Sequence, residues 1–413
     1  MTSTPPLMPE HPALTTDTSM LTRRFGKEVI NYFAGSRLNR YSFLRSDAPF
    51  LQKAATSPAA RFVALDNLSP LVVDKKKLAL LSFDDVKSLI GEEPYRQSDA
   101  DRIKGYDSTA GPSVLIVFLG TVDNEGDVEF ESSEHGKAKG QPYFAIDVTA
   151  KGRQDVERWL KGQEAKGLWV ATDTRSLTLH SEAAAMFAQA RSILDWNSRN
   201  VFCAGCGNPN LSVEAGYKRI CPPTDLKRSS SSSVELPDCP TRHGVSNICF
   251  PRTDPTMIAA VVSADGQRML LGRQSRWPPY WHSTLAGFLE PGESVEEAVR
   301  REVWEEAGVK VGRVVVHSTQ PWPYPSSLMI GAIAQAVPGA GEEINLNDKE
   351  LESAKWFTME EVRTALAQNT GSMMAPPPKE YKDGDLRVPP PQAIANRLMT
   401  AVVEGYLTGN AKI

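Results

Sequence analysis

The chain has 413 residues, of which 41% are hydrophobic and 23% charged, and its formal net charge of -4 gives a sequence pI near 6.0. This length exceeds that of one ordinary domain and predicts two or three, and without an apolar run of about 18 residues we expect no membrane-spanning segment. The slightly acidic balance offers no general attraction to polyanions, so a broad nucleic-acid-binding face is not expected.

The first 200 residues predict a disordered lead-in followed by a folded domain. Met1 to Ser19 are rich in Pro, Thr and Ser and lack the pattern of a secretory signal, so we expect residues 1–27 to be disordered. Between residues 28 and 200, strand-like runs alternate with polar breaks, and Ser181 to Trp196 has helical spacing. The runs are Arg61–Leu65, Lys77–Phe83, Val114–Leu119 and Tyr143–Val148. This pattern predicts an N-terminal mixed α/β domain closed by a helix.

All the cysteines fall within residues 201–252, which predicts a metal site in that segment. Cys203 and Cys206 form a C-x2-C pair, and Cys221 follows after a gap of fourteen residues. Thiols clustered in this way favour zinc over a disulfide framework. The glycine Gly207, directly after the pair, lets the backbone amides turn toward the sulfurs. Lys227 to Ser233, with five consecutive serines, reads as a flexible insertion in this zinc ribbon.

The fourth zinc ligand has three candidates in the sequence: Cys239, His243 and Cys249. We favour Cys239, because four thiolates are the usual ligand set of a zinc ribbon. Cys249 is more typical of a small core residue. Four protein ligands would leave no open position for water, so we expect a structural zinc.

Residues 287–309 read GFLEPGESVEEAVRREVWEEAGV and predict a capped helix. Ser294 and Glu297 have the spacing of a capping box, and Gly308 stands where a left-handed C-terminal cap is needed. We expect a helix from Val295 to Ala307.

Three carboxylates share one face of this helix. Glu302, Glu305 and Glu306 are at positions i, i+3 and i+4, where like charges repel. Mg²⁺ or Mn²⁺, which prefer oxygen ligands, would neutralise them and bridge to substrate phosphates. The pattern therefore favours a catalytic divalent cation over a solvated acidic helix.

The segment resembles the Nudix box at every defining position, including Glu293 and Arg301. The resemblance implies that Glu302 and Glu306 ligate the catalytic metal, that Glu305 ligates it or acts on the attacking water, and that Arg301 positions the carboxylates. It also implies that the carbonyl of Ala286 is a ligand. A further acidic ligand is expected from a later loop, where Glu350 is our first candidate and Glu352 the alternative.

Residues 319–327 read TQPWPYPSS and predict a stiff loop with aromatic faces, suited to a flat ring or simply to covering the core. They resemble the SQPWPFPxS signature of NADH pyrophosphatases and differ from it at Thr319 and Tyr324. The resemblance implies that the whole segment binds substrate, and adds Phe250 and Ala395 as contacts. The expected substrate-binding residues are Thr319, Gln320, Pro321, Trp322, Pro323, Tyr324, Pro325, Ser326, Ser327, Phe250 and Ala395.

The chain is thus identified as resembling eukaryotic, fungal-like NADH pyrophosphatases of the Nudix hydrolase family. The resemblance implies an α/β (α+β) fold: an NADH-pyrophosphatase-like domain over 28–200, the zinc ribbon over 201–252 and a Nudix α/β/α sandwich over 253–400. It implies hydrolysis of NADH, and of NAD and related dinucleotides, to AMP and nicotinamide mononucleotide by a homodimer. The alternatives are removal of NAD caps from RNA 5′ ends and a non-catalytic zinc-ribbon interaction module, against which the intact glutamates of the box argue.

The chain ends Ala411-Lys412-Ile413, within a tail of residues 401–413. This tripeptide resembles the Ser-Lys-Leu signal that a peroxisomal import receptor reads. We therefore expect a peroxisomal location, with the cytoplasm as the alternative.

Overall fold

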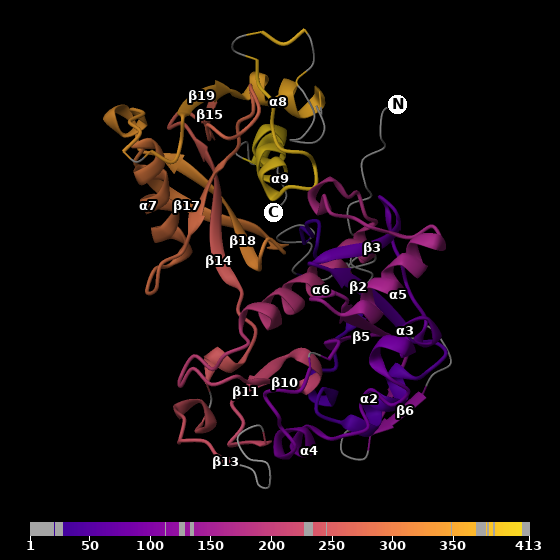
Figure 1. Ribbon diagram of the computed structural model, residues 1–413. Helices are drawn as coiled ribbons and strands as arrows, with labels where there is room; N and C mark the ends of the chain where they lie inside the picture. Colours follow the sequence, from indigo (N-terminus) through magenta and orange to yellow (C-terminus); the bar gives the residue numbers. More distant parts are fainter. Residues whose placement is uncertain are drawn as a thin grey trace.

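The structure is a computed structural model. It describes residues 20, 28–111, 113–123, 129–132, 136–226, 234–244, 246–347, 349–368, 377, 380–382 and 385–406. Met1 to Ser19, Lys227 to Ser233 and Ala411 to Ile413, for which the sequence made predictions, lie outside this set. Within the described residues, no helix combines the length and apolar character that a membrane crossing requires. In Figure 1 the C-terminal domain lies at the upper left, and the cysteine-rich segment lies below it, beside the lower part of the N-terminal domain.

The N-terminal domain is built on a mixed seven-stranded sheet of order β1-β5-β8-β2-β3-β4, with β9 paired to β3. These strands are β1 Leu38–Asn39, β2 Arg61–Asp66, β3 Ser69–Asp74, β4 Lys77–Leu78, β5 Ile116–Val122, β8 Gln141–Asp147 and β9 Trp169–Val170. A separate hairpin comprises β6 Glu129–Ser132 and β7 Gly136–Lys139. The helices are α2 Ala48–Ala55, α3 Phe83–Ile90, α4 Asp99–Lys104, α5 Gln154–Ala165 and α6 Ser181–Arg199.

Alternating side chains divide the core of this domain between the two faces of its sheet. Val63 and Leu65 of β2 point into a cluster that includes Phe187 of α6, whereas Phe62 and Ala64 point into a cluster beneath α2, α3 and α5. Successive side chains of a strand face opposite ways, so a strand buried on both faces is apolar throughout. Helix α6 packs on one face together with residues of other segments, including Tyr32, Leu179 and Tyr217, and is the closing helix that the helical spacing predicted.

One predicted strand of this domain was wrong over most of its length. Of the expected run Lys77–Phe83, only Lys77–Leu78 forms a strand, and Leu81 adds a single bridge to Phe62. The chain then enters α3, because Ser82 and Asp85 form a capping box that starts a helix at Phe83. The local cap prevails over the apolar run.

The cysteine-rich segment contains two short antiparallel hairpins. They pair β10 Leu211–Val213 with β11 Lys218–Ile220, and β12 Thr224–Asp225 with β13 Val234–Glu235. Asp225 ties the second hairpin to the N-terminal domain, because its carboxylate accepts hydrogen bonds from the backbone and side chain of Ser108 at 3.1 and 2.7 Å. The described part of this segment thus rests against the first domain.

The C-terminal domain has a six-stranded sheet of order β17-β18-β14-β15-β19, with β16 paired to β14. Only the β14–β18 pair is parallel. The elements are β14 Asp254–Val262, β15 Arg268–Arg273, β16 Leu285–Phe288, α7 Val295–Ala307, β17 Val311–Trp322, β18 Ser327–Ala336, β19 Ser353–Thr358, α8 Met359–Gln368 and α9 Ile394–Ala401. Helix α7 packs on one face, and α8 and α9 pack on the other, which is the expected α/β/α sandwich.

The expected loop at residues 319–327 is the end of a β hairpin. Thr319 to Trp322 belong to β17, and Ser327 opens β18 with Ser327 opposite Trp322. Proline is tolerated at a strand end, where a missing N–H costs least, so the proline-rich composition did not exclude this pairing. Most of the motif is therefore hydrogen-bonded within the β17–β18 pair, and Pro323 to Ser326 form the turn between the strands.

We expect Gly308→Ala to destabilise the C-terminal domain more than Gly339→Ala does. Both glycines have left-handed φ values, 71° and 72°, but a Cβ at Gly308 would lie 2.7 Å from the carbonyl oxygen of Asn345, and one at Gly339 meets no described atom within 4 Å. The backbone cost of about 1–2 kcal/mol is common to both variants, so their difference isolates the clash.

Thermal unfolding followed by circular dichroism measures this difference. The apparent melting temperature of Gly308→Ala should fall several degrees below that of Gly339→Ala, since about 1 kcal/mol moves a domain of this size by roughly 2–4 °C. Equal shifts would show that Asn345 yields without cost.

Candidate functional site

Helix α7 holds the predicted carboxylates, and its ends match the predicted residues. Ser294 and Glu297 form both bonds of a capping box, and Gly308 closes the helix with φ 71°. Ala298, Val299 and Val303 are completely buried against the sheet, which fixes the rotation of the helix about its axis. This rotation also fixes where Glu302, Glu305 and Glu306 lie relative to the buried face.

The three glutamates differ in their exposure to solvent. The Glu305 side chain is 40% exposed and that of Glu302 14%, whereas the residue Glu306 is only 3% exposed. Glu306 therefore lies at the boundary of the core. A carboxylate in such a place is costly unless a positive charge or hydrogen bonds compensate for the lost hydration.

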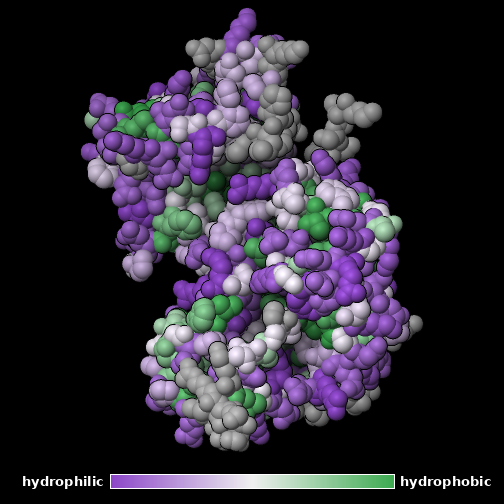
Figure 2. Space-filling model, viewed as in Figure 1, coloured by the Kyte–Doolittle hydropathy of each residue, from purple (hydrophilic) through white to green (hydrophobic). Residues whose placement is uncertain are grey.

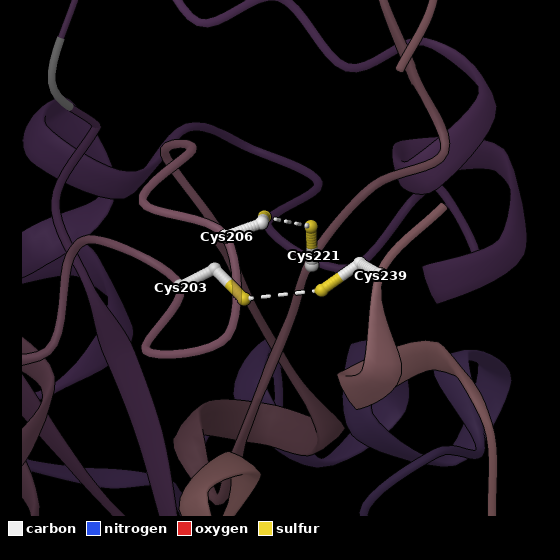
Figure 3. A group of neighbouring side chains, drawn as sticks. All are labelled: Cys203, Cys206, Cys221 and Cys239. Carbon is white, nitrogen blue, oxygen red and sulfur yellow. Dashed lines mark hydrogen bonds between the residues drawn. The ribbon is translucent and has the colours of Figure 1, made fainter. Parts of the chain in front are cut away.

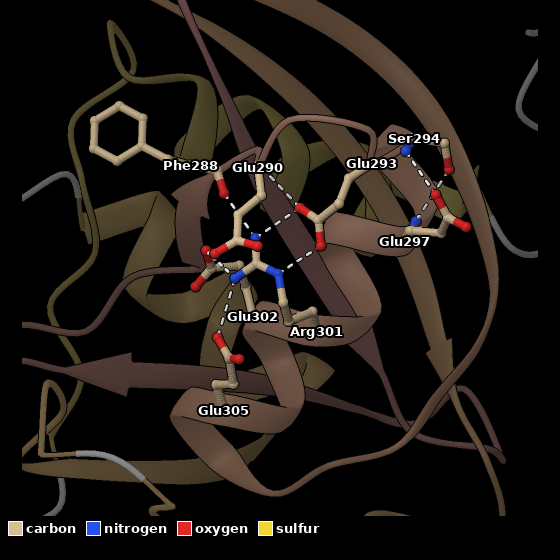
Figure 4. A network of polar contacts seen from close by, with 8 residues as sticks. All are labelled: Phe288, Glu290, Glu293, Ser294, Glu297, Arg301, Glu302 and Glu305. Atoms are coloured by element: carbon tan, nitrogen blue, oxygen red, sulfur yellow. Dashed lines mark hydrogen bonds and ion pairs between the residues drawn. The ribbon is translucent and has the colours of Figure 1, made fainter.

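Arg301 connects Glu302 and Glu305 to Glu293 and to the strand beside them (Figure 4). Its Nε and Nη2 donate to the two oxygens of Glu293 at 2.6 and 2.8 Å. Its Nη1 donates to Glu302 at 2.9 Å and to Glu305 at 3.0 Å, and Nη2 also donates to the carbonyl of Phe288 at 2.9 Å. One planar guanidinium thus holds three carboxylates and the end of β16.

The electrostatics of the cluster differ from one carboxylate to the next. Hydrogen bonds from Arg301, with one from the backbone of Glu290, lower the pKa of Glu293 to about 2. Burial raises the pKa of Glu302; Arg301 opposes this, while the negative charges of Glu305 and Glu350 add to it. A cation close to Glu302 would therefore favour the ionised form of this carboxylate.

The backbone of β16 comes unusually close to the Glu302 carboxylate. A Cβ on Gly287 would lie 2.0 Å from Glu302 Cδ and 2.3 Å from each of its oxygens, so only glycine leaves the carboxylate this place. Ala286, the preceding residue, pairs with Ile258 of β14 in the same strand. Carboxylates and a strand backbone thus lie close together, and an all-oxygen donor set suits Mg²⁺ or Mn²⁺.

The two later acidic candidates have different partners. Glu352 forms an ion pair with Arg273 at 2.8 Å. Glu350 accepts a hydrogen bond from Gln274 Nε2 at 3.1 Å, and its charge acts on Glu302. This favours Glu350 as the carboxylate that completes the cluster. Gln274 was not singled out in the sequence, and no spacing signal links it to Glu350.

Four cysteine sulfurs form a second candidate metal site (Figure 3). The sulfurs of Cys203, Cys206, Cys221 and Cys239 all lie within 4.8 Å of one another, with 3.6 Å between Cys203 and Cys239 and 3.5 Å between Cys206 and Cys221. Four thiols at these distances surround a point as tetrahedral zinc ligands do. The chemistry and arrangement of the donors therefore fit Zn²⁺.

The other two candidates for the fourth ligand lie outside this group. His243 Nε2 is 2.6 Å from the Asp238 carboxylate, and Cys249 contacts the carbonyl of Thr241 at 4.0 Å. Neighbouring donors instead point to the clustered sulfurs: the Thr241 hydroxyl lies 3.3 Å from Cys203, and Arg242 Nη2 lies 3.4 Å from Cys221. Such donors stabilise thiolates, the form that binds metal.

The predicted substrate-binding residues are not gathered in one exposed pocket of a single chain. Thr319 is exposed, whereas Gln320 is completely buried. Phe250 is 37% exposed, with Lys218 Nζ 5.4 Å from its ring centre. Ala395 is 3% exposed and packs within the core on α9, so a single chain offers almost none of its surface to a ligand.

Family models match three parts of the chain. A NADH pyrophosphatase-like rudimentary NUDIX domain matches residues 59–196, a NADH pyrophosphatase zinc ribbon domain matches 198–227, and a NUDIX domain matches 253–375. The NAD-capped RNA hydrolase of Schizosaccharomyces pombe is 36% identical over 375 residues, which cover 90% of this chain and 92% of that protein. The chain belongs to the Nudix hydrolase family. The zinc ribbon and the NADH pyrophosphatase-like domain are part of the same relationship.

Two further relatives of this Nudix hydrolase differ in the names they carry. NAD-capped RNA hydrolase NUDT12 of Macaca fascicularis is 35% identical over 90% of this chain and 73% of its own length. NAD(P)H pyrophosphatase NUDT13, mitochondrial, of Mus musculus is 36% identical over 64% of this chain and 68% of its own length.

We expect Cys206→Ser to release zinc and to lower thermal stability together, because a lost thiolate opens a site whose binding free energy contributes to folding. Metal analysis of protein purified without added zinc should find about one zinc per chain in the wild type and markedly less in the variant. Cys249→Ser is the matched control and should retain zinc. An intramolecular disulfide in the wild type, or no zinc, would contradict the metal assignment.

We expect Gly287→Ala to abolish most activity of the Nudix domain while leaving it folded. The new methyl group would displace the Glu302 carboxylate, a side-chain end that can move without unfolding the sheet. Gly312→Ala, on β17, is the control, since its nearest described neighbour would be 3.6 Å from the added Cβ. Activity assays with melting temperatures decide the matter, and a fully active Gly287→Ala would refute the importance of this close approach.

Proposed function

We propose that this chain hydrolyses the diphosphate bond of NADH, and of NAD and related dinucleotides, to AMP and nicotinamide mononucleotide. The observation that carries the proposal is the Glu302 carboxylate set against the bare backbone of Gly287, with Glu305 and Glu306 beside it. The chain belongs to a family of hydrolases, which supports hydrolysis at this cluster. The mouse relative is named as an NAD(P)H pyrophosphatase, which supports a nicotinamide dinucleotide as the substrate. A non-catalytic module would have no need of this crowded and costly arrangement.

The residues that we assign to the catalytic divalent cation are Glu302, Glu306, Glu350 and the carbonyl of Ala286. Mg²⁺ or Mn²⁺ bound there would polarise the diphosphate and lower the pKa of a bound water. We assign to Glu305, the most exposed of the three helix carboxylates, the role of orienting the attacking water and accepting its proton, with metal ligation as the alternative role. Arg301 holds Glu302 and Glu305 in position, and Glu293 holds Arg301.

We assign the zinc a structural role only. Its proposed ligands Cys203, Cys206, Cys221 and Cys239 fill four positions and leave none for water. The ribbon strands β10, β11 and β13 lie at the lower end of the view in Figure 1, away from helix α7 near its upper end. Loss of this zinc would therefore act on activity through folding.

Removal of NAD caps from RNA 5′ ends is the second candidate, because the S. pombe and macaque relatives are named for that activity. It breaks the same diphosphate bond and differs in the length of chain that the site must admit. Turnover of NADH, NAD, NADPH, diadenosine diphosphate and NAD-capped RNA under one set of conditions, with products identified by mass, ranks the two candidates. An enzyme that cleaves none of them would overturn the proposal.

We further propose a homodimer located in peroxisomes. Exposed apolar side chains on and beside the ribbon, Val201, Phe202, Ile248 and Phe250, support a second copy as partner. Figure 2 shows hydrophobic patches at the lower left of the molecule, where the ribbon lies, as well as elsewhere on this face. Ala411-Lys412-Ile413 would be read by the peroxisomal import receptor, although relatives carry mitochondrial and chloroplastic names and the cytoplasm is the alternative. The expected contacts of Phe250 and Ala395 with the nucleotide belong with this assembly.

We expect Glu306→Gln to reduce turnover of NADH at saturating Mg²⁺ or Mn²⁺ to less than about a tenth of wild type, because a lost metal ligand costs several kcal/mol in the transition state. Stability should be unchanged or slightly higher, since the variant replaces a buried carboxylate by a neutral amide of the same size. Glu360→Gln, on the exposed first turn of α8, is the control. Near-normal turnover of Glu306→Gln would remove Glu306 from the catalytic set.

A further inference from the structure

The side chain of Gln320 joins three separate parts of the chain. It is completely buried. Its Nε2 donates to the carbonyls of Tyr32 at 2.9 Å and Gln392 at 2.8 Å, and its Oε1 accepts from the backbone N–H of Ile394 at 2.9 Å. Both amide protons and the oxygen are therefore engaged by backbone groups, and the buried amide retains no donor for a ligand.

A second buried side-chain amide, that of Asn31 in the N-terminal domain, binds strand β17. Asn31 is completely buried, and its Nδ2 donates to the Ser318 hydroxyl at 3.0 Å and to the Thr319 carbonyl at 2.9 Å. Two successive residues of the N-terminal domain, Asn31 and Tyr32, thus contact three successive residues of β17. These bonds set the position of the strand along its own axis as well as its distance from the domain.

The aromatic residues of the hairpin are held by the same domain. Trp322 and Tyr324 both meet the ring of Phe33 edge-on, with centroids 6.0 and 6.3 Å apart. The guanidinium of Arg191, on α6, lies 4.8 Å from the centre of the Tyr324 ring, and that of Arg175 lies 5.1 Å from it. Cation–π contacts in a partly dry interface are among the stronger ring interactions. The N-terminal domain therefore packs around the tip of the hairpin as well as its strand.

We infer that Gln320 is a positioning residue and not a substrate contact, and that through it the N-terminal domain sets the position of the β17–β18 hairpin. This inference rests on the proposed function. It gives the N-terminal domain a part in substrate selection, because that domain holds the β17–β18 hairpin against which the dinucleotide must fit. The same amide also anchors the start of α9, so the hairpin and α9 are held in one register. A shift of the hairpin would weaken binding of the dinucleotide and leave the carboxylates of α7 in place.

The decisive variant is Gln320→Met, which keeps the length of the side chain and removes every hydrogen bond. We expect KM for NADH to rise about tenfold with kcat within about twofold, because binding is lost and transition-state chemistry is retained. The Mn²⁺ concentration that half-activates the enzyme should not change. Gln335→Met is the matched control: Gln335 is exposed on β18 and donates only within its own domain, to Ala264 at 3.0 Å.

Hydrogen exchange in the ligand-free protein separates positioning from direct contact. Loss of the Gln320 side-chain hydrogen bonds should accelerate backbone amide exchange at Ile394 and in residues 318–322. Loss of a substrate contact alone would leave exchange in the ligand-free protein unchanged. Arg191→Met removes a second contact between the N-terminal domain and the hairpin, that of Arg191 with the Tyr324 ring, and leaves the hydrogen bonds of Gln320 intact. This variant decides the matter if Gln320→Met does not fold. We expect the same direction of change in KM and in exchange over residues 318–324.

Three results would overturn the inference: unchanged exchange in the hairpin, unchanged KM in a folded variant, or a fall in kcat at constant KM. The proposed function fails separately, by absence of NADH hydrolysis in the wild-type enzyme. In that case hydrogen exchange still decides whether Gln320 ties the hairpin to the N-terminal domain, and KM is measured on whichever diphosphate of the panel is cleaved.

Discussion

The catalytic half of the molecule depends on a single constraint: carboxylates that repel one another must be held together at the edge of a packed helix. Arg301 satisfies this constraint, because its five donors and fixed planar shape reach Glu293, Glu302 and Glu305 at once. A lysine would supply the charge without that geometry. The same guanidinium reaches the carbonyl of Phe288, so helix and strand β16 are placed relative to each other by the group that orders the carboxylates.

Sequence signals that act within a few residues predicted their structures well. Ser294, Glu297 and Gly308 delimit α7 at the expected residues, and the helical spacing after Ser181 predicted α6. The same kind of signal explains the error at residues 77–83, where the Ser82 cap starts a helix that the apolar run did not suggest. The fold class followed because each domain has enough such local signals to indicate its elements.

Features that depend on distant parts of the chain could not be predicted from spacing. Helical spacing placed Glu306 beside Glu302 but could not show that it is buried, because burial depends on how α7 is rotated against the sheet. Nothing near Gln320 indicates Tyr32 as its partner, since 288 positions separate the two residues. The four clustered cysteines were predictable as a set, because thiols have few roles and zinc demands a fixed number of them.

The amide of Gln320 also bears on where one cooperative unit ends and the next begins. The region that matches the NUDIX domain, residues 253–375, stops before Gln392 and Ile394 and excludes Tyr32, so all three partners of Gln320 lie outside it. In a fragment cut at those limits, the Gln320 amide, which is buried in the whole chain, would lose its three backbone partners. The rings of Trp322 and Tyr324 would lose their contact with Phe33. The region matched by sequence similarity is therefore shorter than the unit that folds cooperatively. Recombination between relatives would have to exchange the β17–β18 hairpin together with the start of the N-terminal domain.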